Sequence, residues 1–83
     1  MIMTRQEIEQ QVNRFFVEKL EFDESAITPD ADLKENLGMS SIDGVEMRLY
    51  IYKYLGFQPQ KKDMMNIHTV RDVYDYIEQH LPQ

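Results

Sequence analysis

The residues best suited to chemistry lie where a polar loop meets a helix, in the run from Leu37 to Met47. Gly38 closes the loop, Ser40 and Ser41 stand at the predicted start of the helix, and Asp43 falls in its first turn. A helix N-terminus offers unpaired backbone N–H groups and the positive end of the helix dipole. A phosphate ester on the Ser41 hydroxyl would therefore lie in a favourable field.

The two adjacent serines are expected to have different roles. A serine at a helix start is more often an N-cap than a reactive group, and we assign the capping role to Ser40. Taken alone, Ser41 would also be a cap more often than an attachment site for a phosphate ester, and both roles stay open for it here. We expect Ile42 to anchor this turn in the core, and Gly38 to allow a tight turn and the close approach of a partner.

Other chemistries lack the residues that they need. The chain has no cysteine, which excludes disulfides, thiolate metal sites and a cysteine nucleophile. It has no phosphate-binding glycine loop, nucleophile elbow or catalytic pair of carboxylates. His68 and His80 have no acidic residues at ligand spacing, and the segment that begins at Asp30 lacks the glycine and glutamate of a calcium loop. We expect neither an enzyme nor a metal site.

A first helix and a long loop are predicted to precede this segment. The helix, at about residues 5–20, begins with a capping box of Thr4 and Glu7. Its apolar residues recur at helical spacing: Ile8, Val12, Phe15, Phe16 and Leu20. The loop covers residues 21–40, and a short helical turn at 31–35 is possible. Its expected core anchors are Ile27, Leu33 and Leu37.

The central helix is predicted over residues 41–55 and should end at Gly56, a residue that favours helix termination. It is apolar nearly all round, so we expect it to be packed on several sides, with one edge left for solvent or a partner. One side carries Ile42, Val45, Leu49 and Tyr52, and the other carries Met47, Ile51, Tyr54 and Leu55.

A short helix at residues 62–66 and a last helix capped by Thr69 complete the prediction. The apolar face of the last helix consists of Val70, Val73, Tyr76, Ile77 and Leu81. The fold class is therefore all-α, a bundle of three main helices plus one short helix with a long first loop. We expect a single domain over residues 1–83.

Composition limits the partners. The net charge of −6 and the pI near 4.7 argue against nucleic-acid binding, because phosphates repel an acidic domain. No stretch approaches the roughly 18 apolar residues of a membrane span, and the N-terminal residues do not suit a signal peptide. We expect a monomer located in the cytoplasm.

In its ordered motifs the sequence resembles the acyl carrier proteins. Their attachment region reads approximately Leu-Gly-x-Asp-Ser-Leu-Asp, followed by Val-Glu-Leu. The matching residues here are Leu37-Gly38-Met39-Ser40-Ser41-Ile42-Asp43 and then Val45-Glu46-Met47. The run from Ile67 to Ile77 resembles the family's closing Ile-x-Thr-Val-x-Asp-x-x-x-Tyr-Ile. The resemblance covers nearly the whole chain.

The resemblance implies a fold, a cofactor and partners. It implies the acyl-carrier bundle, with 4'-phosphopantetheine transferred from coenzyme A to Ser41 by a phosphopantetheinyl transferase. The arm ends in a thiol, on which acyl groups ride as thioesters for fatty-acid-like or polyketide-like biosynthesis. Acyl-transferring or condensing enzymes would be the partners. The expected recognition surface consists of Met39, Ser40, Ile42, Asp43, Glu46 and Met47.

Departures from the family pattern leave alternatives open. Ser40 replaces the usual Asp, which brings the motif nearer to aminoacyl and peptidyl carriers. Residues 41–67 hold four basic residues against three acidic ones, whereas this region is usually acidic in the family. With Tyr50, Tyr52 and Tyr54 nearby, this predicts dedicated partners and less salt-dependent contacts. An unmodified interaction module with the carrier shape is the other alternative.

The methionines around the central helix also have two interpretations. They are Met39, Met47, Met64 and Met65. Methionine fills irregular cores and also suits adaptable pockets, and we favour core filling over a substrate pocket.

Overall fold

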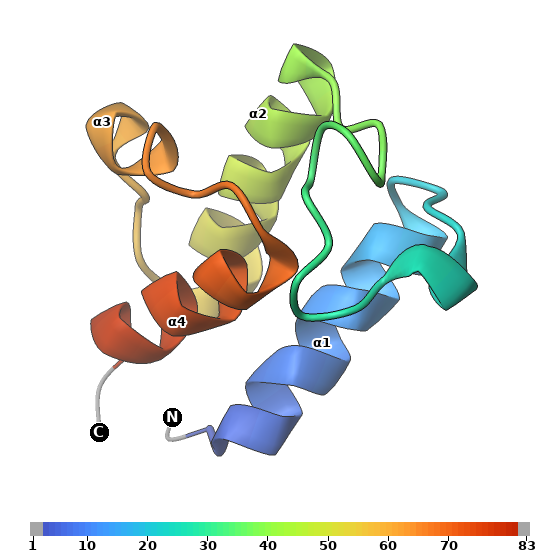
Figure 1. Cartoon of the computed structure of the whole chain (residues 1–83). Helices are drawn as coiled ribbons and strands as arrows, with labels where there is room; N and C mark the ends of the chain where they lie inside the picture. The colour runs from blue at the N-terminus through green and yellow to red at the C-terminus, as the bar shows by residue number, and fades with distance from the viewer. Residues whose placement is uncertain (1–2, 82–83) are drawn as a thin grey trace.

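Four α-helices form the framework of residues 3–81, which are the residues that the computed structural model describes (Figure 1). The elements are α1 (Arg5–Glu18), η1 (Glu24–Ala26), α2 (Ser41–Tyr50), η2 (Ile51–Leu55), α3 (Lys61–Met64) and α4 (Val70–His80). The described residues contain no β-strand, and one isolated bridge pairs Asp32 with Thr69. This confirms the predicted bundle of three main helices, one short helix and a long first loop.

The three main helices begin with the same device. In each, an N-cap hydroxyl accepts a hydrogen bond from the backbone N–H three residues on, and the acidic side chain there accepts one from the N-cap N–H. Two donors that would otherwise be unpaired are satisfied at each start. The pairs are Thr4 with Glu7, Ser40 with Asp43, and Thr69 with Asp72.

Some helix bounds differ from the prediction. The first helix ends at Glu18, because the Leu20 and Phe22 N–H groups turn back to the carbonyl oxygens of Phe15 and Phe16. The short helix is Lys61–Met64 instead of 62–66. The helical turn considered at 31–35 lies about two residues later, as a turn at 33–37 with hydrogen bonds from the Asn36 N–H to the Asp32 carbonyl at 2.9 Å and from the Gly38 N–H to the Lys34 carbonyl at 3.1 Å.

The predicted helix over 41–55 changes its character along its length. It is an α-helix to Tyr50 and then a π-helix, η2, which ends at Gly56 with a left-handed backbone (φ 85°). In a π-helix each residue turns by less than in an α-helix. Tyr54, which was predicted to lie on the same side as Met47 and Ile51, is 63% exposed.

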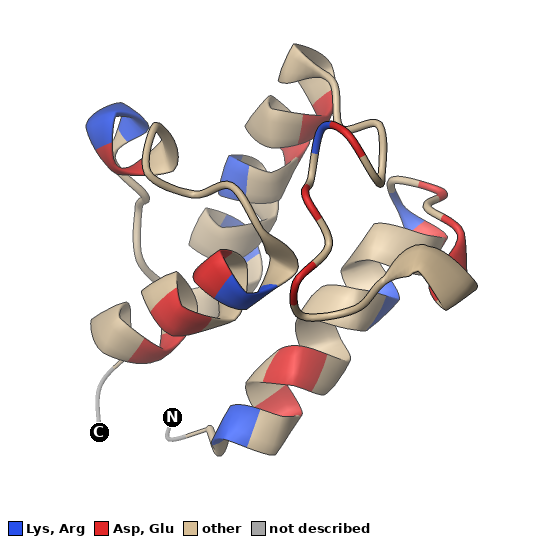
Figure 2. Cartoon of the chain, in the orientation of Figure 1, with Lys and Arg blue, Asp and Glu red and all other residues tan. Residues whose placement is uncertain are grey.

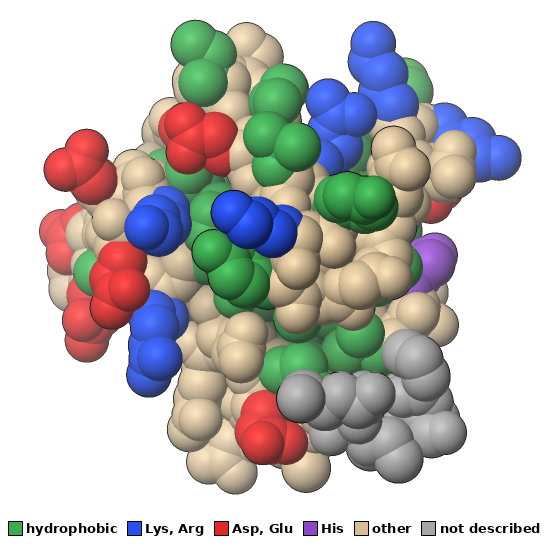
Figure 3. Space-filling model, turned by 180° about the vertical axis from the view of Figure 1, so that it is seen from behind, with side chains coloured by type: hydrophobic (Ala, Val, Ile, Leu, Met, Phe, Trp, Pro, Cys, Tyr) green, Lys and Arg blue, Asp and Glu red, His purple; other side chains and the backbone are tan. Residues whose placement is uncertain are grey.

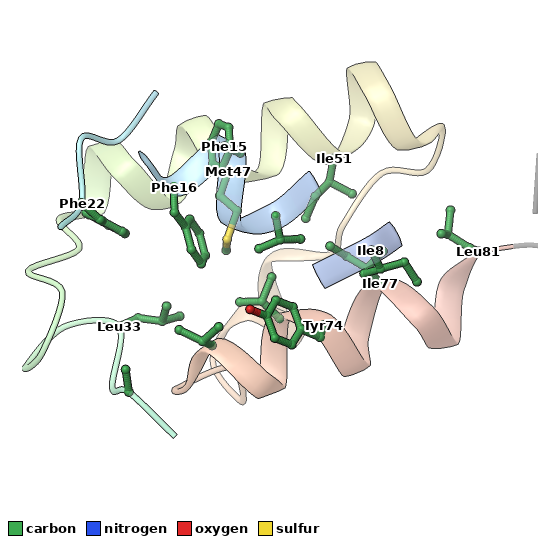
Figure 4. Packing of buried hydrophobic residues seen from close by; sticks show 14 residues of the cluster. Ile8, Phe15, Phe16, Phe22, Leu33, Met47, Ile51, Tyr74, Ile77 and Leu81 are labelled. Carbon is green, nitrogen blue, oxygen red and sulfur yellow. The ribbon is translucent and has the colours of Figure 1, made fainter. Parts of the chain in front are cut away.

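The core lies between the three main helices, and α1 packs against α4 (Figure 4). Its most deeply buried side chains are Phe16, Ile8, Ile51, Ile77, Val70 and Val73. The predicted apolar faces of α1 and α4 are confirmed. Phe22, Ala31 and Tyr74 are also buried, although sequence periodicity did not identify them.

The expectation that the central helix is packed on several sides is wrong. Met47 is the buried residue of α2 and Ile51 that of η2. The opposite side, with Ile42, Val45, Leu49 and Tyr52, is exposed. The buried residues Met47 and Ile51 join the core cluster with residues of α1 and α4, while α3 is a single turn that buries no residue of its own.

Backbone hydrogen bonds tie the first loop to the segment before α4. The Leu33 N–H donates to the His68 carbonyl at 2.9 Å, and the Val70 N–H donates to the Ala31 carbonyl at 3.1 Å. The loop then folds back on itself, since the Met39 N–H donates to the Leu33 carbonyl at 2.8 Å. The start of α2 is therefore held in place by contacts with the distant end of the chain.

Candidate functional site

Ser40 caps the central helix as predicted, and Ser41 takes no part in the cap. The Ser40 Oγ accepts a hydrogen bond from the Asp43 N–H at 3.1 Å, and the Asp43 carboxylate accepts one from the Ser40 N–H at 3.0 Å. Ser41 is exposed, and its hydroxyl has no hydrogen-bond partner within residues 3–81. The N-cap position is thus occupied by Ser40, and the Ser41 oxygen is accessible to a modifying enzyme.

The first turn of α2 also presents free donors. The backbone N–H groups of Ser41 and Ile42 have no acceptor among the described residues, whereas those of Asp43 and Gly44 bond to Ser40. Such groups and the helix dipole attract an anion at this end. A phosphodiester on the Ser41 oxygen fits this environment.

A cavity of about 460 Å³ lies beside Ser41, between the first loop, α2 and α3. Its apolar wall comes from side chains that are far apart in sequence, including Leu33, Val45 and Ile67. All four methionines considered above line it. Met65 is 76% exposed, so the expectation that this group only fills the core is wrong for that residue.

The predicted recognition residues lie in different environments. Ser40, Ser41, Ile42 and Glu46 are exposed, and Met39 and Asp43 are half-buried. Ile42 is 69% exposed, so the prediction that it anchors the turn in the core is wrong, because no element covers that side of α2. Met47 is 5% exposed and belongs to the core, so it is removed from the predicted contact surface.

The charges around the site reflect the slight excess of basic residues in the segment 41–67. Figure 2 shows Lys and Arg on the later part of α2 and on α3, and many acidic residues on α1, the first loop and α4. Arg48, Lys61 and Lys34 line the cavity, and none forms an ion pair within the described part of the chain. Sequence spacing gave no sign of this grouping, because the three residues come from three separate segments.

Comparison with known proteins identifies the family. A family model described as "Phosphopantetheine attachment site" matches residues 10–77. The acyl carrier protein of Thermotoga maritima is 36% identical over 94% of this chain and 96% of its own length. That of Rubrobacter xylanophilus is 32% identical over the same shares of the two chains. The chain belongs to the acyl carrier protein family. A solved acyl carrier protein structure from Enterococcus faecalis agrees, with a TM-score of 0.76 and 27% identity over 93% of this chain and 98% of that one.

Membership of the acyl carrier protein family brings a prosthetic group. Proteins of this family carry covalently attached 4'-phosphopantetheine, and the exposed hydroxyl, the free N–H groups and the adjoining cavity at the start of α2 fit that group. Within residues 3–81, no helix has both the length and the apolar character needed to cross a bilayer.

Proposed function

We propose that this acyl carrier protein holds its arm on Ser41 and carries acyl intermediates for fatty-acid-like or polyketide-like biosynthesis. The observation that carries the proposal is the exposed Ser41 hydroxyl, which has no hydrogen-bond partner in residues 3–81 and stands at the N-terminus of α2. The arm supplies a terminal thiol, to which an acyl group is joined as a thioester.

The chain's own residues hold and orient the attachment point. Ser41 provides the oxygen that becomes part of the phosphodiester. The Ser41 and Ile42 N–H groups, at the positive end of the helix, would hold the phosphate anion of the attached arm. Ser40 and Asp43 hold the helix start with two hydrogen bonds, next to the exposed side chain that carries the attachment oxygen.

The cavity beside Ser41 supports an acyl cargo over an aminoacyl one. Leu33, Met39, Val45, Met64 and Ile67 give it a mainly apolar wall. Burial of an acyl chain there would be favoured by about 0.8 kcal/mol for each methylene removed from water. An aminoacyl group carries an ammonium ion, which such a wall would not solvate.

The remaining properties belong to the same proposal. The protein acts as a single carrier domain over residues 1–83, as a monomer in the cytoplasm, and performs no catalysis itself. A phosphopantetheinyl transferase loads it, and dedicated acyl-transferring or condensing enzymes use it. Their contact surface includes Met39, Ser40, Ile42, Asp43 and Glu46.

Intact mass spectrometry tests the attachment. The chain is incubated with coenzyme A and a broad-specificity phosphopantetheinyl transferase, and a gain of one phosphopantetheine is expected. Ser41→Ala should abolish the gain, and the neighbouring control Ser40→Ala should retain it. A gain that survives Ser41→Ala would refute the assignment, and no gain with several transferases would favour the unmodified interaction module.

A further inference from the structure

One side of α2 and η2 is an apolar surface with nothing packed on it. We call this the α2 face and define it as Ile42, Val45, Leu49 and Tyr52. Their spacing places them in one stripe along the helix, and their exposed fractions are 69%, 45%, 61% and 59%. The other large apolar residues with high exposure in residues 3–81 are Tyr54, which lies in η2, and Met65, which follows α3.

Such a concentration needs an explanation. Single exposed apolar side chains are common on soluble proteins, whereas a contiguous group marks a contact surface. A groove of about 420 Å³ runs beside the stripe, between Leu49, Tyr52 and Pro59. The stripe begins next to Ser41, so a protein bound there would also reach the attachment point.

The charges that flank the α2 face are mainly positive. Arg48 and Lys53 belong to α2 and η2, Lys61 lines the cavity that Val45 and Arg48 also line, and Lys62 follows it in α3. None of the four has an acidic partner within 4.0 Å among the described residues. Lys53 contacts the Tyr54 ring instead, at 5.6 Å from the ring centre. The carboxylates of α2 are Asp43, which also accepts the capping hydrogen bond from the Ser40 N–H, and Glu46. Figure 3 shows this side, where hydrophobic side chains lie among Lys and Arg, and most of the acidic side chains lie toward the left edge, with one beside the hydrophobic side chains near the top.

We propose that the α2 face docks an apolar element of a partner enzyme that is flanked by acidic side chains. The apolar stripe supplies the buried contact, and the bases around it select and orient a partner of opposite charge. This inference rests on the proposed function, because it assigns the partner chemistry of the same attachment site. The protein as a whole carries a net charge of −6, so the basic surface is local and serves one side of the molecule.

Two synthetic helical peptides test the partner chemistry. They share one Leu and Phe stripe, and one has Glu at its flanking positions whereas the other has Lys. Binding is measured by fluorescence anisotropy as the full chain is added. At about 50 mM salt we expect the Glu peptide to bind about tenfold more tightly than the Lys peptide. At about 500 mM salt the preference should fall to about twofold, since salt screens the charges and leaves the apolar contact.

Variants assign the binding to the α2 face. The double variant Leu49→Ser with Tyr52→Ser should weaken both peptides by about tenfold or more, and circular dichroism should be unchanged because both side chains are exposed. Arg48→Glu with Lys53→Glu should reverse the preference between the peptides. Arg14→Glu with Arg71→Glu is the matched control, because it makes the same change of charge in α1 and α4, outside the face, and should leave the preference unchanged.

Several outcomes would overturn the proposal. These are equal binding of the two peptides, no saturable binding of either, or binding that the Leu49 and Tyr52 substitutions do not weaken.

Vesicles of phosphatidylcholine and phosphatidylserine test a lipid surface as the alternative. Binding to the vesicles through the α2 face, without a preference for the Glu peptide, would indicate a lipid surface instead of a protein. All assays are repeated with Ser41→Ala, so docking can succeed or fail independently of arm attachment.

Discussion

The hydroxyl of Tyr76 in α4 donates a hydrogen bond to the Asp63 carboxylate in α3 at 3.0 Å, and it accepts one from the Gln60 N–H at 3.3 Å. Tyr76 is largely buried, and burial raises the pKa of its hydroxyl, so it remains a donor at neutral pH. The short helix α3 has no buried residue and no side-chain cap. The Tyr76 hydroxyl therefore helps to hold one wall of the cavity beside Ser41.

Tyr76→Phe should loosen α3 while leaving the core intact. The variant removes the hydroxyl and keeps the ring, so we expect a loss of about 1 kcal/mol in the free energy of unfolding. Amides of residues 61–67 should exchange with solvent faster, because their local opening becomes easier. Tyr74→Phe is the matched control, since it removes a hydroxyl that contacts Asn13 in α1. Unchanged exchange over 61–67 in Tyr76→Phe would contradict this role.

The two serines at the start of α2 should differ in their effect on stability. Ser40→Ala removes the N-cap, and we expect the free energy of unfolding to fall by about 1 kcal/mol in urea titrations. Ser41→Ala should change it by less than about 0.5 kcal/mol, because its exposed side chain has no hydrogen bond in the described chain. Equal losses in the two variants would show that Ser41 shares the capping role.

Gly38 and Gly44 should respond in opposite ways to alanine. Gly38 has a left-handed backbone (φ 73°), so Gly38→Ala should destabilise by about 1 kcal/mol, although a methyl group would meet no atom there within 4 Å. Gly44 lies inside α2 with open space around a new methyl group, so Gly44→Ala should stabilise by about 0.5–1 kcal/mol. Thermal melting of the pair measures both, and a stabilising Gly38→Ala would contradict the assigned backbone strain.

Asp72 should make the free energy of unfolding depend on pH in the acidic range. Partial burial acts to raise the pKa of Asp72, but hydrogen bonds from the His68 and Thr69 N–H groups lower it, and the net pKa lies below its ordinary value. A carboxyl group with a lower pKa in the folded state stabilises the fold at pH values above its unfolded-state pKa, which is about 4 for Asp. This stabilisation is lost as the pH falls through the folded-state pKa.

The variant Asp72→Asn tests this dependence. We expect it to lower the free energy of unfolding at pH 7 by on the order of 1 kcal/mol through the weakened cap. Its difference from the wild type should narrow below about pH 3, where Asp72 itself becomes protonated. The measurement is urea unfolding at both pH values. A difference that is the same at pH 7 and at acidic pH would contradict the lowered pKa.

The features that could be predicted from sequence are local ones. The capping pairs at Thr4, Ser40 and Thr69 depend on side chains three residues apart, so the starts of the three main helices were predicted correctly. The division between a capping Ser40 and a free Ser41 hydroxyl follows from the same spacing. The turn at Gly56 needs only a left-handed residue, which glycine provides.

The errors concern contacts between distant segments. Periodicity predicts two apolar sides for α2, but it does not tell which of them another element covers. Ile42 was therefore expected in the core, and it is exposed. Phe22 stands alone in the first loop, and its burial depends on the turn back to the Phe16 carbonyl at 3.0 Å. The cavity needs the relative placement of the loop, α2 and α3, which hydrogen bonds such as that between Leu33 and His68 set.

The unbonded Ser41 hydroxyl gives this protein a clean thermodynamic reference. Attaching an arm to this oxygen breaks no folding contact, and the stabilisation that its phosphate gains at the helix N-terminus is the same with and without an acyl group. Any rise in melting temperature when the thiol is acylated then measures the transfer of the acyl chain from water into the protein. A series of increasing acyl length would report how many methylene groups the protein can bury.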